Sequence, residues 1–215
     1  MKLHSPPIPT RSSDGKYAFP TVKEPASGSK GVVTSNHVLA SHAGVELLLA
    51  GGNAVDAAIG TMFALSVVEP MMTTVFGAGF TNIHMADGTD IVIDNYAEVP
   101  KAATPDLFEP IPDHLDHGVV DDLNLTGHLA VGVGGTCLGW ATAIEKYGNL
   151  ELYDVVAPAV RLATKGFPVS PYLKQSIINA ESGLRRFTDS QKVFLPGDHV
   201  PEVGHRIIRS DYANT

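Results

Sequence analysis

Apolar positions at helical spacing open the patterned part of the chain and predict a helix over residues 37–50. Ser35 or Asn36 can cap its start, and Gly51-Gly52 can end it through a left-handed residue. Its larger apolar side chains fall on one face, which we expect to meet the core: Val38, Val45, Leu48 and Leu49.

A second helix is predicted almost at once, over residues 54–68. Asn53 stands at its N-cap position and Asp56 lies three residues further on, so both side chains can accept hydrogen bonds from amides of the first turn. Asp56 is also the one charged residue of this stretch, which indicates a helix buried on all sides. Pro70 ends it. For Asn53 and Asp56 we favour helix capping over a catalytic role.

The remaining pattern predicts a hairpin, an excursion and several further helices. Strand-like residues 79–86 and 90–95 flank the turn signal Asp87-Gly88. Residues 100–125 show little periodicity and indicate an exposed excursion. The later elements that we predict are a strand over 130–133, helices over 136–147, 152–165 and 171–187, and a turn-rich polar stretch after Thr188.

Composition and charge exclude several classes of protein. Hydrophobic residues make up 44% and charged residues 18% of the 215, which excludes a disordered or coiled-coil chain. The formal net charge is −8, and residues 87–122 alone carry −9, so one acidic segment accounts for the imbalance. An acidic chain of this kind argues against a nucleic-acid-binding protein. The one cysteine, Cys137, excludes an intrachain disulfide and an all-cysteine zinc site.

Residues 1–30 are rich in Pro and Ser and predict an N-terminal arm, with residues 31–215 forming the folded part. The arm lacks the apolar core of a signal peptide, which favours a cytoplasmic protein and leaves a periplasmic or secreted one open. The longest apolar run, residues 57–68, is shorter than the roughly 20 residues that a membrane-spanning helix needs, so no span is predicted.

Two histidines with acidic neighbours have the residue types of a metal site. His114 and His117 are three positions apart, within a segment 113–122 that also holds four aspartates. Flanking prolines and Gly118 disfavour the regular helix that would bring the two imidazoles together. We therefore favour a solvated acidic loop over a metal site, and we predict no cofactor.

The glycines of residues 132–135 precede a predicted helix, which is the setting of a phosphate-binding loop. The run lacks the G-x-G-x-x-G spacing, because Cys137 occupies the position of the third glycine, and it lacks the Lys-Ser/Thr ending of a P-loop. Close packing of a strand against a helix is the favoured reason for these glycines. Cys137 can act as a nucleophile at a helix start, but no base is evident near it, and a buried structural thiol is favoured.

Several segments resemble, in the same order, the large-subunit region of the gamma-glutamyltransferase (gamma-glutamyltranspeptidase) family of N-terminal-nucleophile hydrolases. The most specific is the run A-G-G-N-A-V-D-A-A at residues 50–58, and the resemblance covers about residues 31–175. The other matching stretches are residues 33–37, 39–41, 43–44, 68–70, 79–80, 103–108, 130–133, 147–148, 157–159, 161–163 and 166–170.

The resemblance implies an α/β (α+β) fold with four layers, α-β-β-α, shared with a second, small chain of the same precursor. It implies an autoprocessed enzyme in which the small chain begins with a Thr. The Thr hydroxyl attacks the amide of a small-molecule substrate, with the Thr α-amino group as base. No catalytic residue is then expected on this chain, which supplies scaffold and one wall of the pocket. The family's large subunit continues well past 215 residues, so a longer subunit is expected.

Two positions depart from the family pattern. Aligning Pro100 and the motif at 103–106 places Tyr96 where gamma-glutamyl-specific members carry an Arg that pairs with the substrate's α-carboxylate. Tyr96 is our candidate substrate-binding residue, and it predicts a relative that acts on a different amide. A true gamma-glutamyltransferase and a non-catalytic family member remain the alternatives. Phe76 and Ala78 replace glycines of the family's loop, and Phe76 either narrows the pocket or packs against the core.

Overall fold

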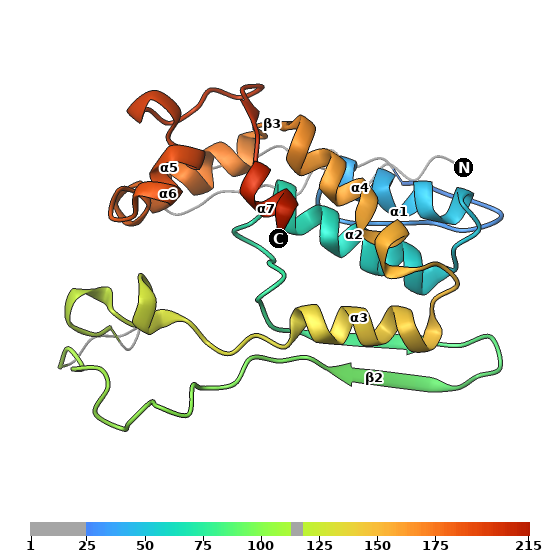
Figure 1. The fold of residues 1–215 in the computed structure, drawn as a ribbon, viewed down its shortest axis with the longest axis horizontal. Helices are drawn as coiled ribbons and strands as arrows, with labels where there is room; N and C mark the ends of the chain where they lie inside the picture. Colours follow the sequence, from blue (N-terminus) through green and yellow to red (C-terminus); the bar gives the residue numbers. More distant parts are fainter. Residues whose placement is uncertain (1–24, 113–117) are drawn as a thin grey trace. The chain divides into compact units, whose positions relative to one another are not determined.

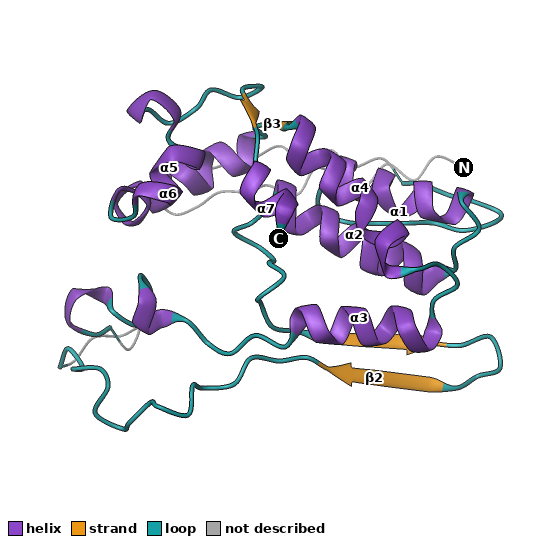
Figure 2. Ribbon diagram, viewed as in Figure 1, coloured by secondary structure: helices purple, strands orange, loops and turns teal. Residues whose placement is uncertain are grey.

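The computed structural model describes residues 25–112 and 118–215. The chain forms two units, residues 1–32 and 33–215. Residues 25–32 of the first unit contain no helix or strand. In the second unit the helices are α1 (Val38–Leu49), α2 (Ala54–Val68), α3 (Thr136–Tyr147), α4 (Leu152–Lys165), α5 (Pro171–Arg185), α6 (Thr188–Phe194) and α7 (Ser210–Asn214). The strands are β1 (Phe80–His84), β2 (Asp90–Asp94), β3 (Phe167–Pro168) and β4 (Arg206–Ile207) (Figures 1 and 2).

Helix α1 forms as predicted but buries a different face. The side chains of Val38 and Leu49 are 65% and 84% exposed, whereas four residues at i, i+3, i+4 and i+7 are buried. The cause is close contact with α2, since a Cβ atom on Gly44 would lie 2.3 Å from Thr61 Oγ1. Small residues therefore set the buried face, and the prediction from large apolar residues was wrong. The buried residues are Ala40, Ala43, Gly44 and Leu47.

The N-cap of α1 also differs from the prediction. His37 caps the helix, because its Nδ1 accepts a hydrogen bond from the Leu39 amide at 3.1 Å. Asn36 instead donates to the Glu69 carboxylate, at 2.8 and 3.0 Å. The predicted end is confirmed, since Gly51 has a φ of 95°, a conformation that favours glycine.

Helix α2 has the predicted bounds and is buried along most of its length. It packs against α1 and α4 on one side and against α3 on another (Figure 1). The apolar core gathers around it and includes Ile59, Phe63, Trp140 and Val155. The ring of Phe63 meets that of Trp140 edge to face, with centroids 4.9 Å apart. Helix α2 is thus the central element to which the hairpin side and the helical side both attach.

Strands β1 and β2 form the predicted antiparallel hairpin, with Asn82 opposite Val92. Ile83 points inward, and α3 lies along this face of the hairpin (Figure 1). The other face is open, because Phe80 and Val92 are each 64% exposed. A two-stranded sheet is marginally stable by itself, so α3 supplies much of its support.

Two predictions beyond the hairpin were wrong. Residues 130–133 do not form a strand, because a 3-10 turn covers His128–Ala130 and Val133 makes one isolated bridge to Glu98. The stretch after Thr188 is not irregular, since it contains α6, β4 and α7. Helices of seven and five residues are too short to show a periodic pattern in sequence.

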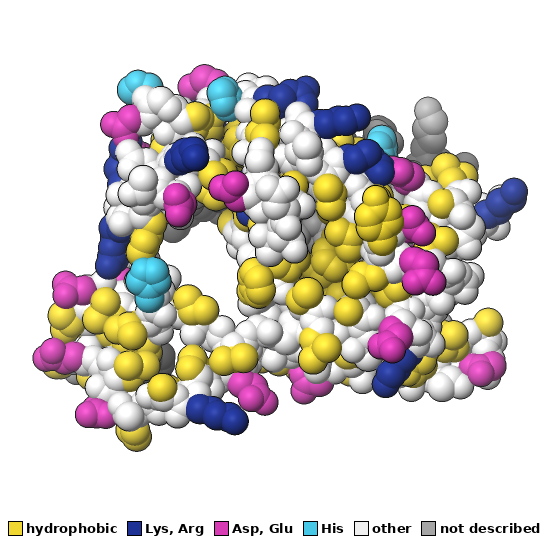
Figure 3. Space-filling view, viewed as in Figure 1, with side chains coloured by type: hydrophobic (Ala, Val, Ile, Leu, Met, Phe, Trp, Pro, Cys, Tyr) yellow, Lys and Arg dark blue, Asp and Glu magenta, His cyan; other side chains and the backbone are white. Residues whose placement is uncertain are grey.

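The acidic excursion is largely exposed where the structure describes it, in residues 100–112 and 118–125. Its ordered features there are a bridge between Pro110 and Val119 and a 3-10 turn over Val120–Asp122. Acidic and hydrophobic side chains both stand at its surface (Figure 3). No helix in the described ranges is long and apolar enough to cross a bilayer.

Candidate functional site

Tyr96 follows β2 by two residues and lies at the open end of the hairpin. Its ring stacks on that of Phe80, with centroids 5.5 Å apart and planes inclined by 26°. The Tyr96 amide donates to the Asp94 carboxylate at 3.0 Å, which fixes the turn of the chain out of the strand. Tyr96 is 61% exposed and Phe80 64% exposed. The two rings therefore form an aromatic platform, Phe80–Tyr96, with much of its surface open.

A cavity of about 230 Å³ lies beside this platform, between α2, β1 and the start of α3. Asn95, next to Tyr96, is 5% exposed and donates through Nδ2 to Thr136 Oγ1 at 3.3 Å. The Asn95 Oδ1 atom is buried and has no hydrogen-bond partner within the described residues. The apolar part of the lining includes Ile59, Met62, Phe80 and Trp140. Sequence reasoning missed this cavity, since its walls come from five separate stretches of the chain.

The glycines before and within α3 serve close packing. A Cβ atom on Gly134 would lie 2.0 Å from the carbonyl oxygen of Phe76, and one on Gly139 would lie 2.5 Å from Cβ of Asn95. The backbone of Phe76 thereby lies directly against the residues that precede α3, and Asn95, which follows β2, lies directly against α3 itself. The predicted packing role is confirmed for Gly134, although its neighbour is a loop and the strand predicted over 130–133 does not form.

The exposure of Cys137 and of Phe76 tests the predictions made for these two residues. Cys137 is exposed, so the prediction of a buried structural thiol was wrong. Phe76 is 67% exposed, which contradicts packing into the core. His114 and His117 lie outside the described residues. Within residues 25–112 and 118–215, no group of three His, Cys, Asp or Glu side chains is placed to hold a metal ion.

Asn53 and Asp56 form the predicted capping box at the start of α2. Asp56 is fully buried, and its carboxylate accepts from the amides of Asn53 (2.7 Å), Asn149 (2.9 Å) and Leu150 (3.2 Å). Asn53 Nδ2 donates to the carbonyl oxygen of Tyr147 at 2.7 Å. The pair therefore fixes the start of α2 to the end of α3, a structural role.

Three further polar residues with structural roles were not predicted, namely Glu69, His37 and Arg209. Glu69 is 2% exposed and accepts from Asn36, which anchors the start of α1 to the residue that follows α2. Burial lowers the pKa of His37, while the nearby Glu69 carboxylate opposes this shift. The hint in the sequence was a carboxylate placed directly after a buried helix.

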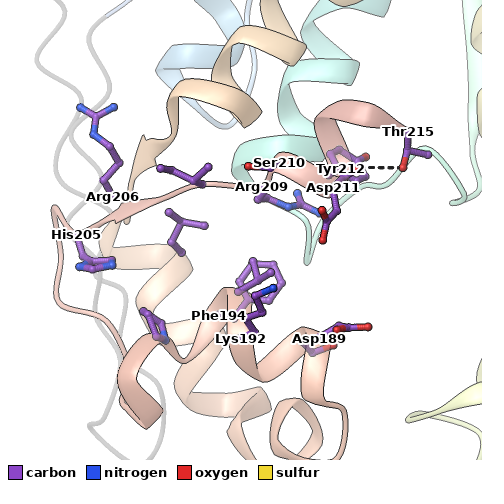
Figure 4. A pocket seen from close by; sticks show the side chains of 15 residues that line it. Asp189, Lys192, Phe194, His205, Arg206, Arg209, Ser210, Asp211, Tyr212 and Thr215 are labelled. Carbon is purple, nitrogen blue, oxygen red and sulfur yellow. Dashed lines mark hydrogen bonds between the residues drawn. The ribbon is translucent and has the colours of Figure 1, made fainter.

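Arg209 holds the other end of α2. Its Nη1 donates to the carbonyl oxygens of Ser66 (2.8 Å) and Val67 (3.0 Å), where the helix dipole favours a cation. The guanidinium lies 4.0 Å from the centroid of the Tyr212 ring, and burial lowers the pKa of Arg209. Arg209 and Tyr212 border a second cavity of about 560 Å³, in which Arg209 reaches toward Tyr212 (Figure 4). This cavity shares no lining residue with the one beside Tyr96.

Solved structures confirm the fold class. The chain matches the gamma-glutamyltranspeptidase of Helicobacter pylori with a TM-score of 0.81 and 32% identity, over 89% of this chain and 54% of that one. The α/β fold of the N-terminal-nucleophile hydrolases is therefore the fold of this chain.

Sequence comparison gives the same family. The chain is 44% identical over 197 residues to the "Acylase ACY 1 proenzyme" of Pseudomonas sp. (strain V22), covering 91% of this chain and 35% of that relative. It is 34% identical over 212 residues to the "Glutathione hydrolase proenzyme" of Bacillus subtilis (strain 168), covering 98% and 35%. The chain thus spans about a third of the length of these relatives. Since residues 40–215 match the sequence profile of Gamma-glutamyltranspeptidase, the chain belongs to the gamma-glutamyltranspeptidase family.

Proposed function

We propose that this chain is the N-terminal portion of the large chain of an enzyme that hydrolyses or transfers an acyl group from an amide. Membership of the family supports the reaction class, and the relatives are named an acylase and a glutathione hydrolase. The observation that carries the proposal is the exposed Tyr96 ring on the aromatic platform. The resemblance to the family implies that Tyr96 stands where gamma-glutamyl-specific members carry a carboxylate-binding Arg.

The nucleophile belongs to the partner chain in this proposal. The hydroxyl of its N-terminal Thr attacks the amide carbonyl, and the free α-amino group takes the hydroxyl proton. Loss of the amine leaves an acyl-enzyme, which water or an acceptor amine then resolves. This chain supplies no catalytic residue, and Tyr96 contacts the acyl donor.

The acyl donor is not strictly gamma-glutamyl. A Tyr hydroxyl can donate one hydrogen bond, whereas an Arg forms a bidentate, charged contact with a carboxylate. Loss of that contact weakens binding of an α-carboxylate by about 2–3 kcal/mol, which is roughly 30- to 150-fold. Tyr96 and Phe80 offer two ring faces in its place, which suits an uncharged acyl group.

The open face of the hairpin supports a partner chain. Phe80 and Val92 expose apolar surface there, and the sheet has two strands in the described residues. Strands with unpaired edges and an exposed apolar face are completed by further strands or covered by another layer. The small chain of the same precursor is the partner that we propose.

Two measurements on the full-length protein test the proposal. Mass spectrometry and N-terminal sequencing are expected to find two chains, the second beginning with Thr. A single uncleaved chain would contradict the proposed nucleophile. Assay with gamma-glutamyl p-nitroanilide and with uncharged acyl p-nitroanilides is expected to favour the uncharged donors. Robust turnover of the gamma-glutamyl compound in preference to them would exclude the altered substrate and leave a true gamma-glutamyltransferase.

A further inference from the structure

Asp94 lies on the open face of the hairpin, directly opposite Phe80. Ile83 points inward, so the alternate positions of β1, which include Phe80, point outward together with their partners on β2. The Asn95 amide donates to the carbonyl oxygen of Gly79 at 3.1 Å. Because ladder hydrogen bonds skip every second pair, Phe80 and Asp94 form a pair without backbone bonds, with Cα atoms about 4.5 Å apart. The Asp94 carboxylate therefore lies beside the Phe80 side chain.

Tyr96 adds a second ring to this surface. Its ring stacks on that of Phe80 with centroids 5.5 Å apart, and its amide donates to Asp94 Oδ1 at 3.0 Å. All three side chains are exposed. Within residues 25–112 and 118–215, the Asp94 carboxylate forms no ion pair. A carboxylate and two ring faces thus share one accessible surface, the Asp94 cluster (Phe80, Asp94 and Tyr96).

No positive charge in the neighbouring sequence balances the Asp94 carboxylate. Residues 80–100 contain four acidic side chains and no Lys or Arg. Residues 132–135, whose glycines lie against residues 95–98, are uncharged, and so is the loop of residues 70–79. The resulting negative potential favours a cation over a neutral group and a neutral group over an anion. The ring faces add to the attraction of a cation, including a quaternary ammonium.

We propose that the Asp94 cluster selects acyl donors by charge. It favours a donor that carries a cationic group such as a quaternary ammonium, ranks an uncharged donor next and disfavours a donor with a carboxylate. Asp94 is then a specificity-determining residue. This inference rests on the proposed acyl-transfer function and adds the substrate class of that same site. The effect is separate from the missing Arg at position 96, because the Asp94 carboxylate repels an anion.

The test uses the full-length protein and two isosteric pairs of acyl p-nitroanilides. The 4-(trimethylammonio)butanoyl and 5,5-dimethylhexanoyl compounds differ in a quaternary nitrogen and carbon, and the glutaryl and glutaramoyl compounds differ in a carboxylate and a carboxamide. A unit charge about 7 Å from a carboxylate changes affinity roughly threefold in bulk water and roughly 50-fold at the effective dielectric constant near a protein surface. We expect kcat/KM to be at least threefold higher for the cation than for its neutral partner, and at least threefold lower for the anion.

Asp94→Asn removes the charge but keeps the oxygen that accepts from the Tyr96 amide. Both ratios are expected to move toward one by at least threefold, and the cost of desolvating each probe cancels because it is common to the two proteins. Asp90→Asn is the matched control, since Asp90 is exposed on the same face about 13 Å along the strand, beyond the Debye length of about 8 Å at physiological salt. It should leave both ratios unchanged.

Salt tests the same effect without any substitution. Raising NaCl from about 0.05 M to about 0.5 M should bring both ratios closer to one in the unsubstituted protein, because the Debye length shortens. Ratios that do not change in Asp94→Asn, or that change equally in Asp90→Asn, would overturn the inference.

Binding separates failure of the inference from failure of the proposed function. Choline and 3,3-dimethylbutan-1-ol differ in the same exchange of a quaternary nitrogen for carbon, and ligand-observed NMR measures their dissociation constants without turnover. Choline is expected to bind at least threefold more tightly, with the difference lost in Asp94→Asn and kept in Asp90→Asn. If no anilide is hydrolysed but this difference is found, the proposed function fails while the cation site stands. Equal affinities in a protein that hydrolyses no anilide overturn both.

Discussion

Replacing Asp56 by Asn should destabilise the protein more than any exposed acidic substitution. The buried carboxylate accepts from three backbone amides, those of Asn53, Asn149 and Leu150. An Asn side chain offers one acceptor oxygen, and its NH₂ group would face a backbone N–H. At least one amide then loses its partner, at about 1–3 kcal/mol, in addition to charge-assisted bonds of about 1.5–3 kcal/mol. We expect a loss of about 3–5 kcal/mol in the free energy of unfolding.

Hydrogen exchange and urea unfolding of the full-length protein measure this effect locally and globally. Exchange of the Asn149 and Leu150 amides should accelerate by a factor of about 100 or more, since every 1.4 kcal/mol is tenfold. Asp154→Asn, at an exposed carboxylate in the first turn of α4, is the matched control and should cost at most about 1 kcal/mol. Unchanged exchange at residues 149 and 150 in Asp56→Asn would refute the capping role.

Three further predictions concern packing, capping and pH. Gly139→Ala should lower the urea midpoint despite the higher helix propensity of Ala, because its Cβ would lie 2.5 Å from Cβ of Asn95. Gly183→Ala in α5 is the control, because its Cβ would lie 3.4 Å from the nearest atom, Cγ2 of Thr126, and this variant should be neutral or stabilising. Equal changes in the urea midpoint for the two variants would contradict the packing role of Gly139. Arg209→Met should cost about 2–4 kcal/mol in thermal or urea unfolding through two lost hydrogen bonds to the end of α2, and a loss below about 0.5 kcal/mol would argue against this anchor. Burial places the pKa of His37 below 6.5 in the folded protein, so its contribution to stability is complete above about pH 6.5 and is lost as the pH falls toward the lowered pKa. His37→Asn retains a capping oxygen that does not titrate, and urea midpoints between about pH 5 and 6.5 should then vary less with pH than in the unsubstituted protein.

The sequence predicted those elements whose causes are local. Helix α2 has its capping box, its buried length and its terminating proline within one short stretch, and its bounds were predicted correctly. The buried face of α1 was not predicted correctly. Ala40 and Gly44 are buried because α2 packs closely against them, and their own hydrophobicity does not indicate this. Short helices such as α6 depend on tertiary packing and leave no periodic signal.

The candidate site likewise has one part that the sequence indicates and one part that only the folded structure reveals. Tyr96 could be singled out as a candidate from the sequence, because it lies close to a stretch that resembles a family motif. The cavity beside it could not, since Ile59, Asn95 and Trp140 meet only after α2, the hairpin and α3 have packed. The hydrogen bond from Arg209 to the carbonyl oxygen of Ser66 joins residues far apart in the chain, so no local sequence pattern predicts it.

The central claim is that Tyr96 sets the acyl preference away from gamma-glutamyl donors. The most direct measurement is kcat/KM of the full-length protein for gamma-glutamyl p-nitroanilide, before and after Tyr96→Arg. Restoring a bidentate contact with the α-carboxylate should raise this value by roughly 30- to 150-fold. Tyr153→Arg, at an 84% exposed Tyr of α4, should leave it unchanged. An equal or lower value in Tyr96→Arg, in a protein that remains folded and cleaved, would contradict the assignment of Tyr96 to the substrate pocket.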